Sequence, residues 1–450
     1  METSEIDILD SRLQRVLEFP KILKKKSGVK LMKSYKLRSF LLVTLCLILL
    51  AAPTGYGDDS VSGNGGNRAD DARQNADLIG ISTFEGGAAY RTADSIYWVL
   101  TLSGSWKEMG RQYGGLVADD LQEFHAAITQ DIARRGMDSD DLLEVAEALT
   151  VSLNNNMREL MQGMSETSGL TYDQIQQLNA GMFILPDLVF GEESPSTCSA
   201  IAVWGDYTTD GKLIIGRNWD MDRKSMKKYM KYLAVVVYNP ESGNSFADVH
   251  PLGNIYIETG FNERGLFIEL NNGMESDSNY YADRKNSVAV LAEALNQCST
   301  IEEAVDYIGN IPADASYIIQ VADSEKCVSI ERPTFDYRVR MAKPDGLLVA
   351  YNSFIPPYPD DWQGRVPDPP TFETDPRYEN LMNTANSDAY YGKFNVDVMK
   401  QLMSLDAAHG GAVHNGTVLQ VIAVPADLML WIRGYDYSDW QQIDLSRLFD

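Results

Sequence analysis

The sequence predicts an α+β fold in which a helix-rich first part precedes a strand-rich second part. Apolar side chains recur at helical spacing over residues 104–135, and further helical stretches follow before Cys198, whereas short apolar runs separated by turn signals come after it. Hydrophobic residues make up 44% of the 450 residues and charged residues 23%, which is typical of a globular protein with a sizeable core. Many antiparallel strands with helices grouped between them indicate a layered α+β domain.

Helices are expected over most of the region before Cys198. Apolar residues at helical spacing extend over residues 104–135, and Gly136 ends this stretch. A second helical stretch covers residues 139–164, and a capping-box pattern at Thr171 begins a third.

Strands are expected after Cys198, with a further helical region at residues 287–310. An Asp-Gly turn joins the first two strands into a hairpin. The expected strands cover residues 200–204, 213–216, 233–238, 255–259, 266–270, 317–322, 328–332, 347–351, 417–424 and 428–432.

A targeting segment is expected at the N-terminus, because basic residues precede an unbroken apolar run over residues 40–52 and small residues follow it. This order is typical of a secretory signal peptide. We therefore expect residues 1–57 to be removed, with Met32 as the natural start, and residues 58–79 to form a disordered leader. The protein would then be secreted or periplasmic, and an uncleaved membrane anchor is the alternative.

The charge of the chain argues against a nucleic-acid partner. The formal net charge is −25, and residues 1–57 carry more basic than acidic groups, so the mature chain would be more negative still. Such a field repels nucleic acid and anionic membrane surfaces. The sequence has no Gly-rich phosphate loop and no zinc-type spacing, so we expect neither cofactor nor metal. The Asp-x-Asp pair of Asp220 and Asp222 is the one weak alternative, since no histidine or third carboxylate is near it in sequence.

Cysteine usage singles out one thiol. Cys46 would leave with the signal peptide, so Cys198, Cys298 and Cys327 remain. An odd number in an exported protein leaves at least one thiol free or paired between chains, and a free thiol there is a candidate reactive group. We interpret Cys298, on an apolar helical stretch, as buried and inert, and a bridge between Cys298 and Cys327 stays open.

The segment that begins at Cys198 carries the chemistry. The expected hairpin returns Arg217 and Asp220 to the same end. A thiol attacks well only as a thiolate, which a nearby arginine stabilises. If Cys198 began a chain, its α-amine, with a pKa near about 8, would serve as the base, and Asp220 would hold it. Because side chains alternate along a strand, we expect the strand to end near Asn218 and to bend at Trp219, so that both side chains reach the cysteine.

These residues carry a family resemblance. The cysteine, the Asp-Gly-Lys turn and the Gly-Arg-Asn-Trp-Asp run together resemble the choloylglycine hydrolase and penicillin V acylase superfamily of N-terminal nucleophile (Ntn) hydrolases. They are most similar to its acyl-coenzyme A:6-aminopenicillanic acid acyltransferase branch, peptidase family C45. Further segments resemble family motifs in the same order, at residues 104–110, 260–266, 270–272, 349–354 and 376–378. Thr197 stands where glycine is common in this branch, and Ser353 where a histidine is usual.

The resemblance implies an αββα sandwich of two antiparallel sheets between helix layers. Residues 80–197 would be a helix-rich pro-segment and residues 198–450 the catalytic domain, separated by autocatalytic cleavage before Cys198. The nucleophile would be Cys198, with Arg217 and Asp220 around it and Arg377 near the thiol. Asn271, or its neighbour Asn272, and Asn352 would be oxyanion or amine-positioning groups, a role that suits neutral, prearranged N–H donors.

The implied activity is that of an amide hydrolase or acyltransferase acting on a small N-acyl amide. The acyl group would sit on a β-lactam, an amino acid, a lactone or a fatty amine, with an acyl-coenzyme A or an amine as a further partner. The two cleaved chains would stay associated. Two other functions stay open: an uncut thiol hydrolase that pairs Cys198 with His414 or His250, and a binding protein that keeps the fold without catalysis.

Overall fold

The computed structural model describes residues 78–151, 153–190, 198–281, 283–367 and 375–449. The expected signal peptide, most of the leader and Thr197, which precedes the expected cleavage point, lie outside these residues. The leader prediction extended to residue 79, whereas the first strand, β1, begins at Leu78. Within the described ranges, no helix combines the length and the apolar character needed to cross a membrane.

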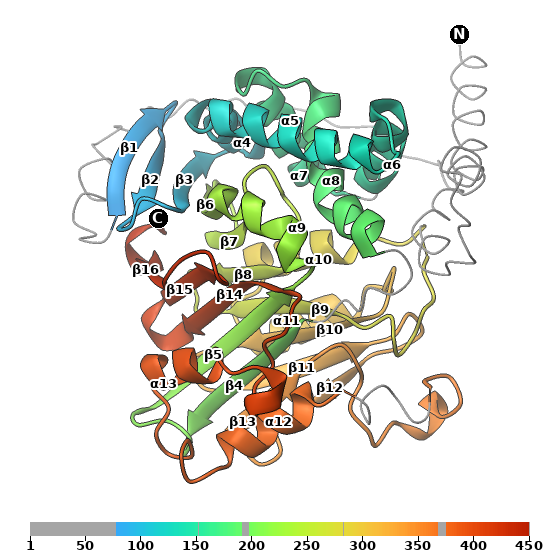
Figure 1. The fold of residues 1–450 in the computed structure, drawn as a ribbon, viewed down its shortest axis with the longest axis vertical. Coiled ribbons are helices and arrows are strands. Elements are labelled where there is room, and N and C mark those ends of the chain that lie inside the picture. Colours follow the sequence, from blue (N-terminus) through green and yellow to red (C-terminus); the bar gives the residue numbers. More distant parts are fainter. Residues whose placement is uncertain (1–77, 152, 191–197, 282, 368–374, 450) are drawn as a thin grey trace.

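Two β-sheets form the centre of the molecule (Figure 1). The six-stranded sheet has the order β13-β4-β5-β14-β15-β16, and the ten-stranded sheet has the order β1-β2-β3-β6-β7-β8-β9-β10-β11-β12. The strands are β1 (Leu78–Phe84), β2 (Gly87–Thr92), β3 (Trp98–Gly104), β4 (Ser199–Gly205), β5 (Gly211–Asp220), β6 (Leu233–Pro240), β7 (Phe246–Pro251), β8 (Thr259–Asn262), β9 (Phe267–Asn272), β10 (Tyr317–Ala322), β11 (Cys327–Arg332), β12 (Arg338–Arg340), β13 (Leu347–Ala350), β14 (Thr417–Val424), β15 (Met429–Gly434) and β16 (Gln441–Asp444).

Helices cover the outer faces of both sheets. The α-helices are α4 (Trp106–Leu116), α5 (Ala118–Arg134), α6 (Ser139–Val151), α7 (Asn155–Thr167), α8 (Tyr172–Phe190), α9 (Arg223–Met226), α10 (Ser287–Gln297), α11 (Ile301–Gly309), α12 (Arg377–Ala385) and α13 (Val396–Leu402). Apolar residues of α12 and α13 pack on the outer face of the six-stranded sheet. Helices α10 and α11 contact strands β8 to β11 of the ten-stranded sheet. The expected α+β sandwich of two sheets between helix layers is therefore confirmed.

The region before Cys198 contains strands that the sequence analysis missed. Besides helices α4 to α8 it provides β1, β2 and β3, and β3 pairs with β6 in parallel from Trp98↔Ala234 to Gly104↔Pro240. The ten-stranded sheet is thus not purely antiparallel as expected. Strand β2 is buried on both faces, so it lacks the alternation of polar and apolar residues that reveals a strand, and the alternation in β3 is short, from Leu100 to Ser103. The expected pro-segment therefore forms part of the central sheet.

The prediction of a strand over residues 255–259 was wrong. Residues 252–258 form no strand, β8 begins at Thr259, and β7 was not predicted. Side-chain amide oxygens accept the backbone hydrogen bonds that a neighbouring strand would otherwise accept. Ile255 N donates to Asn179 Oδ1 and Tyr256 N donates to Asn254 Oδ1, each at 2.8 Å. Buried backbone groups need such partners wherever a strand is absent.

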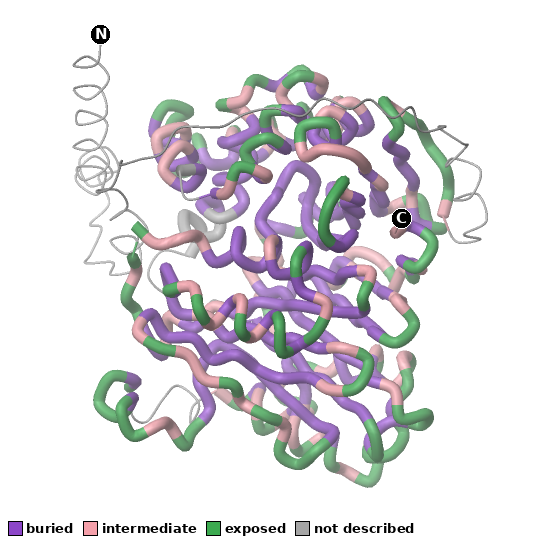
Figure 2. The backbone as a smooth tube through the Cα atoms, turned by 180° about the vertical axis from the view of Figure 1, so that it is seen from behind, coloured by how far each residue is buried: buried purple, intermediate pink, exposed green. Residues whose placement is uncertain are grey.

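The core runs through both sheets. Figure 2 shows buried residues along the central strands and exposed residues mainly in loops and on β1. Strands β6, β7 and β14 are buried on both faces along nearly their whole length. A residue between the sheets therefore meets other protein groups rather than solvent, which raises the cost of placing a charge there.

Candidate active site

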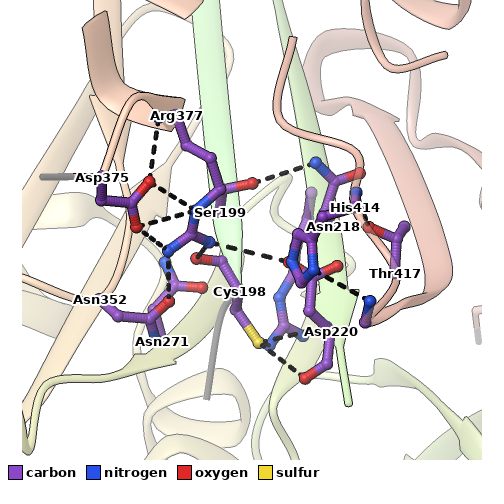
Figure 3. A network of polar contacts seen from close by, with 12 residues as sticks. Cys198, Ser199, Asn218, Asp220, Asn271, Asn352, Asp375, Arg377, His414 and Thr417 are labelled. Atoms are coloured by element: carbon purple, nitrogen blue, oxygen red, sulfur yellow. Dashed lines mark hydrogen bonds and ion pairs between the residues drawn. The ribbon is translucent and has the colours of Figure 1, made fainter. Parts of the chain in front are cut away.

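Cys198 lies immediately before β4 and beside the end of β5. Strands β4 and β5 pair antiparallel with Ser199 opposite Asn218 and Ala200 opposite Arg217. The Cys198 Sγ lies 4.0 Å from Arg217 Nη2 and 3.5 Å from the backbone N of Asp220 (Figure 3). The structure thus brings together the cysteine, the arginine and the aspartate that the hairpin pattern singled out.

Arg217 points into the space between the two sheets. Its side chain is 1% exposed, and its Nε forms an ion pair with Glu269 Oε2 at 3.0 Å. Nη2 donates to the carbonyl of Leu270 at 2.7 Å and Nη1 to the carbonyl of Glu258 at 2.8 Å. Nη1 also contacts the hydroxyl of Thr259. This guanidinium therefore links the sulfur on the six-stranded sheet to β8 and β9 of the ten-stranded sheet.

The expected bend at Trp219 is absent. Strand β5 continues to Asp220, and its pairing with β14 extends to Asp220↔Thr417. Because side chains alternate, Arg217 and Asp220 point to opposite faces of the sheet. Asp220 contacts the sulfur only through its backbone, while its carboxylate lies on the side of Arg377 and His414. An extended strand with a bulge in its partner, between Thr417 and Leu419, replaces the expected bend.

A polar network surrounds the Asp220 carboxylate (Figure 3). His414 Nε2 lies 3.0 Å and Arg377 Nη1 3.8 Å from Asp220 Oδ2. Arg377, which was expected near the thiol, donates from Nη1 to the backbone carbonyl of Cys198 at 3.0 Å. The carboxylate of Asp375 holds the guanidinium, with Nε at 3.0 Å from each of its oxygens. Arg377 therefore fixes the main chain of the cysteine rather than its sulfur.

The two asparagines are buried close to this network. Asn271 Nδ2 donates to Glu269 Oε1 at 2.8 Å, and its Oδ1 has no hydrogen-bond partner among the residues that the structure describes. Asn352 Nδ2 donates to the carbonyl of Asn272 at 2.8 Å, and its Oδ1 accepts from Arg377 at 3.4 Å. The Nδ2 atom of each asparagine carries two hydrogens, and each of these hydrogen bonds uses only one of them. The side chain of Asn272 instead accepts from Met274 N, so of the two neighbours Asn271 lies on the face of β9 that carries Glu269.

Burial sets the electrostatics of the thiol. It raises the pKa of Cys198 to about 12. The positive charge of Arg217 lowers this pKa, whereas the negative charges of Asp220 and Glu258 raise it further. Burial also raises the pKa of Glu258, and that of Glu269 to about 7. With such a pKa the Cys198 sulfur is a protonated thiol at neutral pH.

Neither histidine of the alternative mechanism presents a base to the sulfur. His414 Nδ1 accepts from Gly416 N at 2.9 Å, and its Nε2 faces Asp220. His250 lies 4.0 Å from Glu258 Oε2, and its ring meets Trp219 edge to face. Burial, with the charge of Arg217, lowers the pKa of His250 to about 3.

Sequence reasoning missed several members of the site. Glu258 and Glu269 flank Arg217, and Asp375 holds Arg377. His414 was named only as a possible partner of Cys198, whereas it reaches Asp220 from 194 positions away. Only Asp375 had a sequence signal, since it lies two residues before the arginine of the late family motif. Asp222, the second residue of the Asp-x-Asp pair, caps α9 by accepting from Ser225 N.

The other two cysteines are buried and reduced. Cys298 and Cys327 are both free thiols, so the structure contains no bridge between them. Burial raises the pKa of Cys298 to about 11 and that of Cys327 well above its usual value. Among the described residues, Arg217 contacts the sulfur of Cys198, whereas the sulfur of Cys327 contacts a backbone carbonyl, that of Val328.

The family model "Acyl-coenzyme A:6-aminopenicillanic acid acyl-transferase" matches residues 207–433, half of the chain, and begins after Cys198. The curated protein dcd1B of Dictyostelium discoideum is 23% identical over 317 residues, which are 64% of this chain. The chain spans 60% of the length of that relative.

Solved structures with a partial likeness include three hydrolases. An N-acylethanolamine-hydrolyzing acid amidase ortholog of Caenorhabditis elegans is 19% identical with a TM-score of 0.40, covering 55% of this chain and all (100%) of its own. A mutant conjugated bile acid hydrolase from Clostridium perfringens is 13% identical with a TM-score of 0.39, covering 56% of this chain and 93% of its own. Penicillin V acylase from Agrobacterium tumefaciens is 15% identical with a TM-score of 0.37, covering 56% and 88% respectively.

Proposed function

Because the chain belongs to the acyl-coenzyme A:6-aminopenicillanic acid acyl-transferase family, we propose that it is an Ntn amide hydrolase or acyltransferase that cuts itself before Cys198. The family that the sequence motifs indicated is confirmed by the family match. The observation that carries the proposal is the set of contacts around Cys198: Arg217 at the sulfur, Arg377 at the carbonyl, and the buried Asp220 beside both.

Self-cleavage would proceed by an N-to-S acyl shift. The sulfur attacks the carbonyl carbon of Thr197, the C–N bond to Cys198 breaks, and the thiol proton ends on the departing nitrogen. Water then hydrolyses the thioester, which leaves a carboxyl group on Thr197 and frees the thiol, while the α-amine of Cys198 is already free after the shift. The raised pKa of Cys198 supports a precursor that is inert toward other acyl groups until this amine exists.

Turnover would use the new α-amine as the base. With a pKa near about 8, it accepts the thiol proton at neutral pH, and Arg217 stabilises the thiolate. The thiolate attacks the amide carbonyl of the substrate, and the ammonium returns its proton to the leaving amine. Water or an acceptor amine then removes the acyl group from the sulfur. Asn271 and Asn352 would donate their remaining N–H groups to the oxyanion.

The substrate class follows from the family and the chemistry of the site. The family's description names an acyl-coenzyme A and an amine, 6-aminopenicillanic acid, so the acyl group moves between sulfur and nitrogen. A small N-acyl amide, such as an acylated β-lactam, amino acid, lactone or fatty amine, fits a cysteine nucleophile. We further propose that the enzyme is secreted or periplasmic.

The intact masses of the purified protein test this proposal. Wild-type protein should give two chains, the larger of which begins Cys-Ser-Ala-Ile by Edman sequencing. Cys198→Ala should remain a single chain and lose hydrolysis of chromogenic N-acyl substrates by about a millionfold. Cys298→Ala and Cys327→Ala, which change equally buried thiols, are the controls and should mature and turn over like wild type. A fully active single chain would contradict the proposal.

A further inference from the structure

His414 connects the Asp220 carboxylate to a tight backbone turn before β14. Its Nδ1 accepts a hydrogen bond from Gly416 N at 2.9 Å, so the proton of the neutral ring is on Nε2. Nε2 lies 3.0 Å from Asp220 Oδ2. The ring is therefore a hydrogen-bond donor to this carboxylate rather than an acceptor of the thiol proton.

The turn is shaped to hold the ring in this position. A Cβ at Gly416 would lie 2.5 Å from His414 Cε1 and 2.7 Å from the carbonyl of Met221, so only glycine fits there. Met221 N donates to the carbonyl of Gly416 at 2.8 Å, which ties the turn to the end of β5. The backbone N of His414 donates to the Thr417 hydroxyl at 3.2 Å. These contacts fix the tautomer and the orientation of the imidazole before any substrate binds.

The second carboxylate oxygen of Asp220, Oδ1, can accept a hydrogen bond from a new donor. The Asp220 side chain is 0% exposed, and Oδ2 faces both His414 and Arg377. Its Oδ1 has no hydrogen-bond partner among the residues that the structure describes. A buried carboxylate oxygen without a donor is costly. The α-amine that cleavage before Cys198 would create is a donor of the required kind, and Cys198 lies next to Asp220.

We propose that His414 is a positioning residue for the reaction of Cys198. By holding Oδ2, it turns Oδ1 of Asp220 toward the new α-amine and keeps the carboxylate from rotating. This inference rests on the proposed function, because it needs a cleaved Cys198. His414 touches neither substrate nor sulfur in this role, and all of its effect passes through Asp220.

Hydrogen-bond donation can be separated from ring shape by substitution. His414→Ala removes the donor and should lower kcat by about tenfold or more, with KM nearly unchanged, since a hydrogen bond to a charged group is lost. His414→Gln places an amide N–H near the Nε2 position and should retain kcat within about threefold. Gly416→Ala adds a Cβ that would displace the imidazole ring, so it should lower kcat as much as His414→Ala does. His409→Ala is the matched control, because His409 also pairs with an aspartate, Asp406, but on the surface.

A double-mutant cycle with Asp220 tests whether His414 acts through the carboxylate. In an Asp220→Asn background, His414→Ala should change kcat by less than about twofold, because the carboxylate that it positions is gone. The same tenfold loss in both backgrounds would overturn the inference and favour an independent role such as a direct base. Wild-type kcat in His414→Ala, or an inactive but folded His414→Gln, would also overturn it. Activity retained by Cys198→Ala would instead overturn the proposed function.

Discussion

The two faces of strand β5 at its C-terminal end carry opposite charges. On the face toward the ten-stranded sheet, Arg217 lies among Glu258 and Glu269 and next to the Cys198 sulfur. On the opposite face, Asp220 lies among cationic and hydrogen-bonding groups from Arg377 and His414. The cation thus stands beside the atom that must become a thiolate, and the anion stands on the other side of the same strand.

This difference explains how Arg217 and Asp220, three positions apart on a strand without a bend, can both lie beside Cys198. The nitrogen and carbonyl of Cys198 lie near the plane of the sheet, where groups from either face reach them, whereas the sulfur projects to one face only. Alternation therefore assigns Arg217 to the sulfur and Asp220 to the main chain of the cysteine. Substitutions on the two faces of β5 therefore test the two assignments separately.

Changes to Arg217 should have the largest effect, on both activity and stability. Arg217→Met leaves Glu258 and Glu269 without their buried cation and should cost about 3–5 kcal/mol of unfolding free energy. Arg217→Lys keeps the charge but loses the planar fork, and should still lower kcat/KM by more than about a hundredfold. Thermal unfolding and kinetics on a chromogenic N-acyl substrate measure both effects.

Lys212→Met is the control for Arg217 on the same strand. Lys212 is 42% exposed and pairs with Asp427 on the surface, so its loss should change stability by no more than about 0.5 kcal/mol. If Arg217→Lys matured and turned over like wild type, the face toward the ten-stranded sheet would not carry the chemistry of the sulfur.

Asp220→Asn should damage function with little loss of stability. The amide keeps the shape of the side chain but lacks the charge that holds an ammonium, so self-cleavage and kcat should each fall by about a hundredfold. A time course on a denaturing gel and steady-state kinetics measure the two steps. Asp222→Asn is the control, because Asp222 only caps α9 and asparagine is an equally good cap. Loss of stability without loss of rate would assign Asp220 a purely structural role.

The part of the site that the sequence predicted is the part that one hairpin builds. Arg217 and Asp220 lie on β5, and Cys198 immediately precedes β4, the strand that pairs with it, so their proximity follows from local pairing. The orientation of Asp220 was not predicted, because β5 continues straight to Asp220 where it pairs with β14, a strand that lies far away in the sequence. The Arg377 and His414 contacts join segments far apart in the sequence, and no local pattern marks such pairs.

The fold shows the same limit. The division into helices and strands after Cys198 was largely predictable, because turn signals separate apolar runs there. The parallel pairing of β3 with β6 was not, since no local pattern in the sequence indicates which distant strand is the partner. Strand β7 was missed because it carries Asp248 and His250, which are polar yet buried. Tertiary burial overrode the local pattern at each of these places.

The neighbouring residues Asn271 and Asn272 extend the comparison of faces to β9. Asn271 is fully buried and shares the face of Glu269, whereas the Asn272 side chain caps a turn at Met274. Asn271→Ala should lower kcat by about tenfold to a hundredfold with little change in KM, as expected for an oxyanion donor. Asn272→Ala should stay within about threefold of wild type. The reverse ranking would place Asn272, not Asn271, at the reacting carbonyl.

The smallest effect expected is a pH dependence of stability that originates on the face of Arg217. Burial raises the pKa of Glu269 to about 7 in the folded chain, from its ordinary value of 4.5. Between these pH values the folded chain binds more protons than the unfolded chain, so its stability should fall as pH rises from about 4.5 to 7, by at most about 3 kcal/mol from this group. Burial also raises the pKa of Asp314, to about 6, which adds to the same slope.

Glu269→Gln tests this origin, because the glutamine side chain cannot ionise. The substitution should flatten the decrease of Tm between pH 5 and 7.5 without abolishing it. Glu302→Gln, on the surface beside Lys326, should leave the slope unchanged. An unaltered slope in Glu269→Gln would mean that Arg217 keeps Glu269 ionised throughout this range, and that the pH dependence originates in other buried carboxyls.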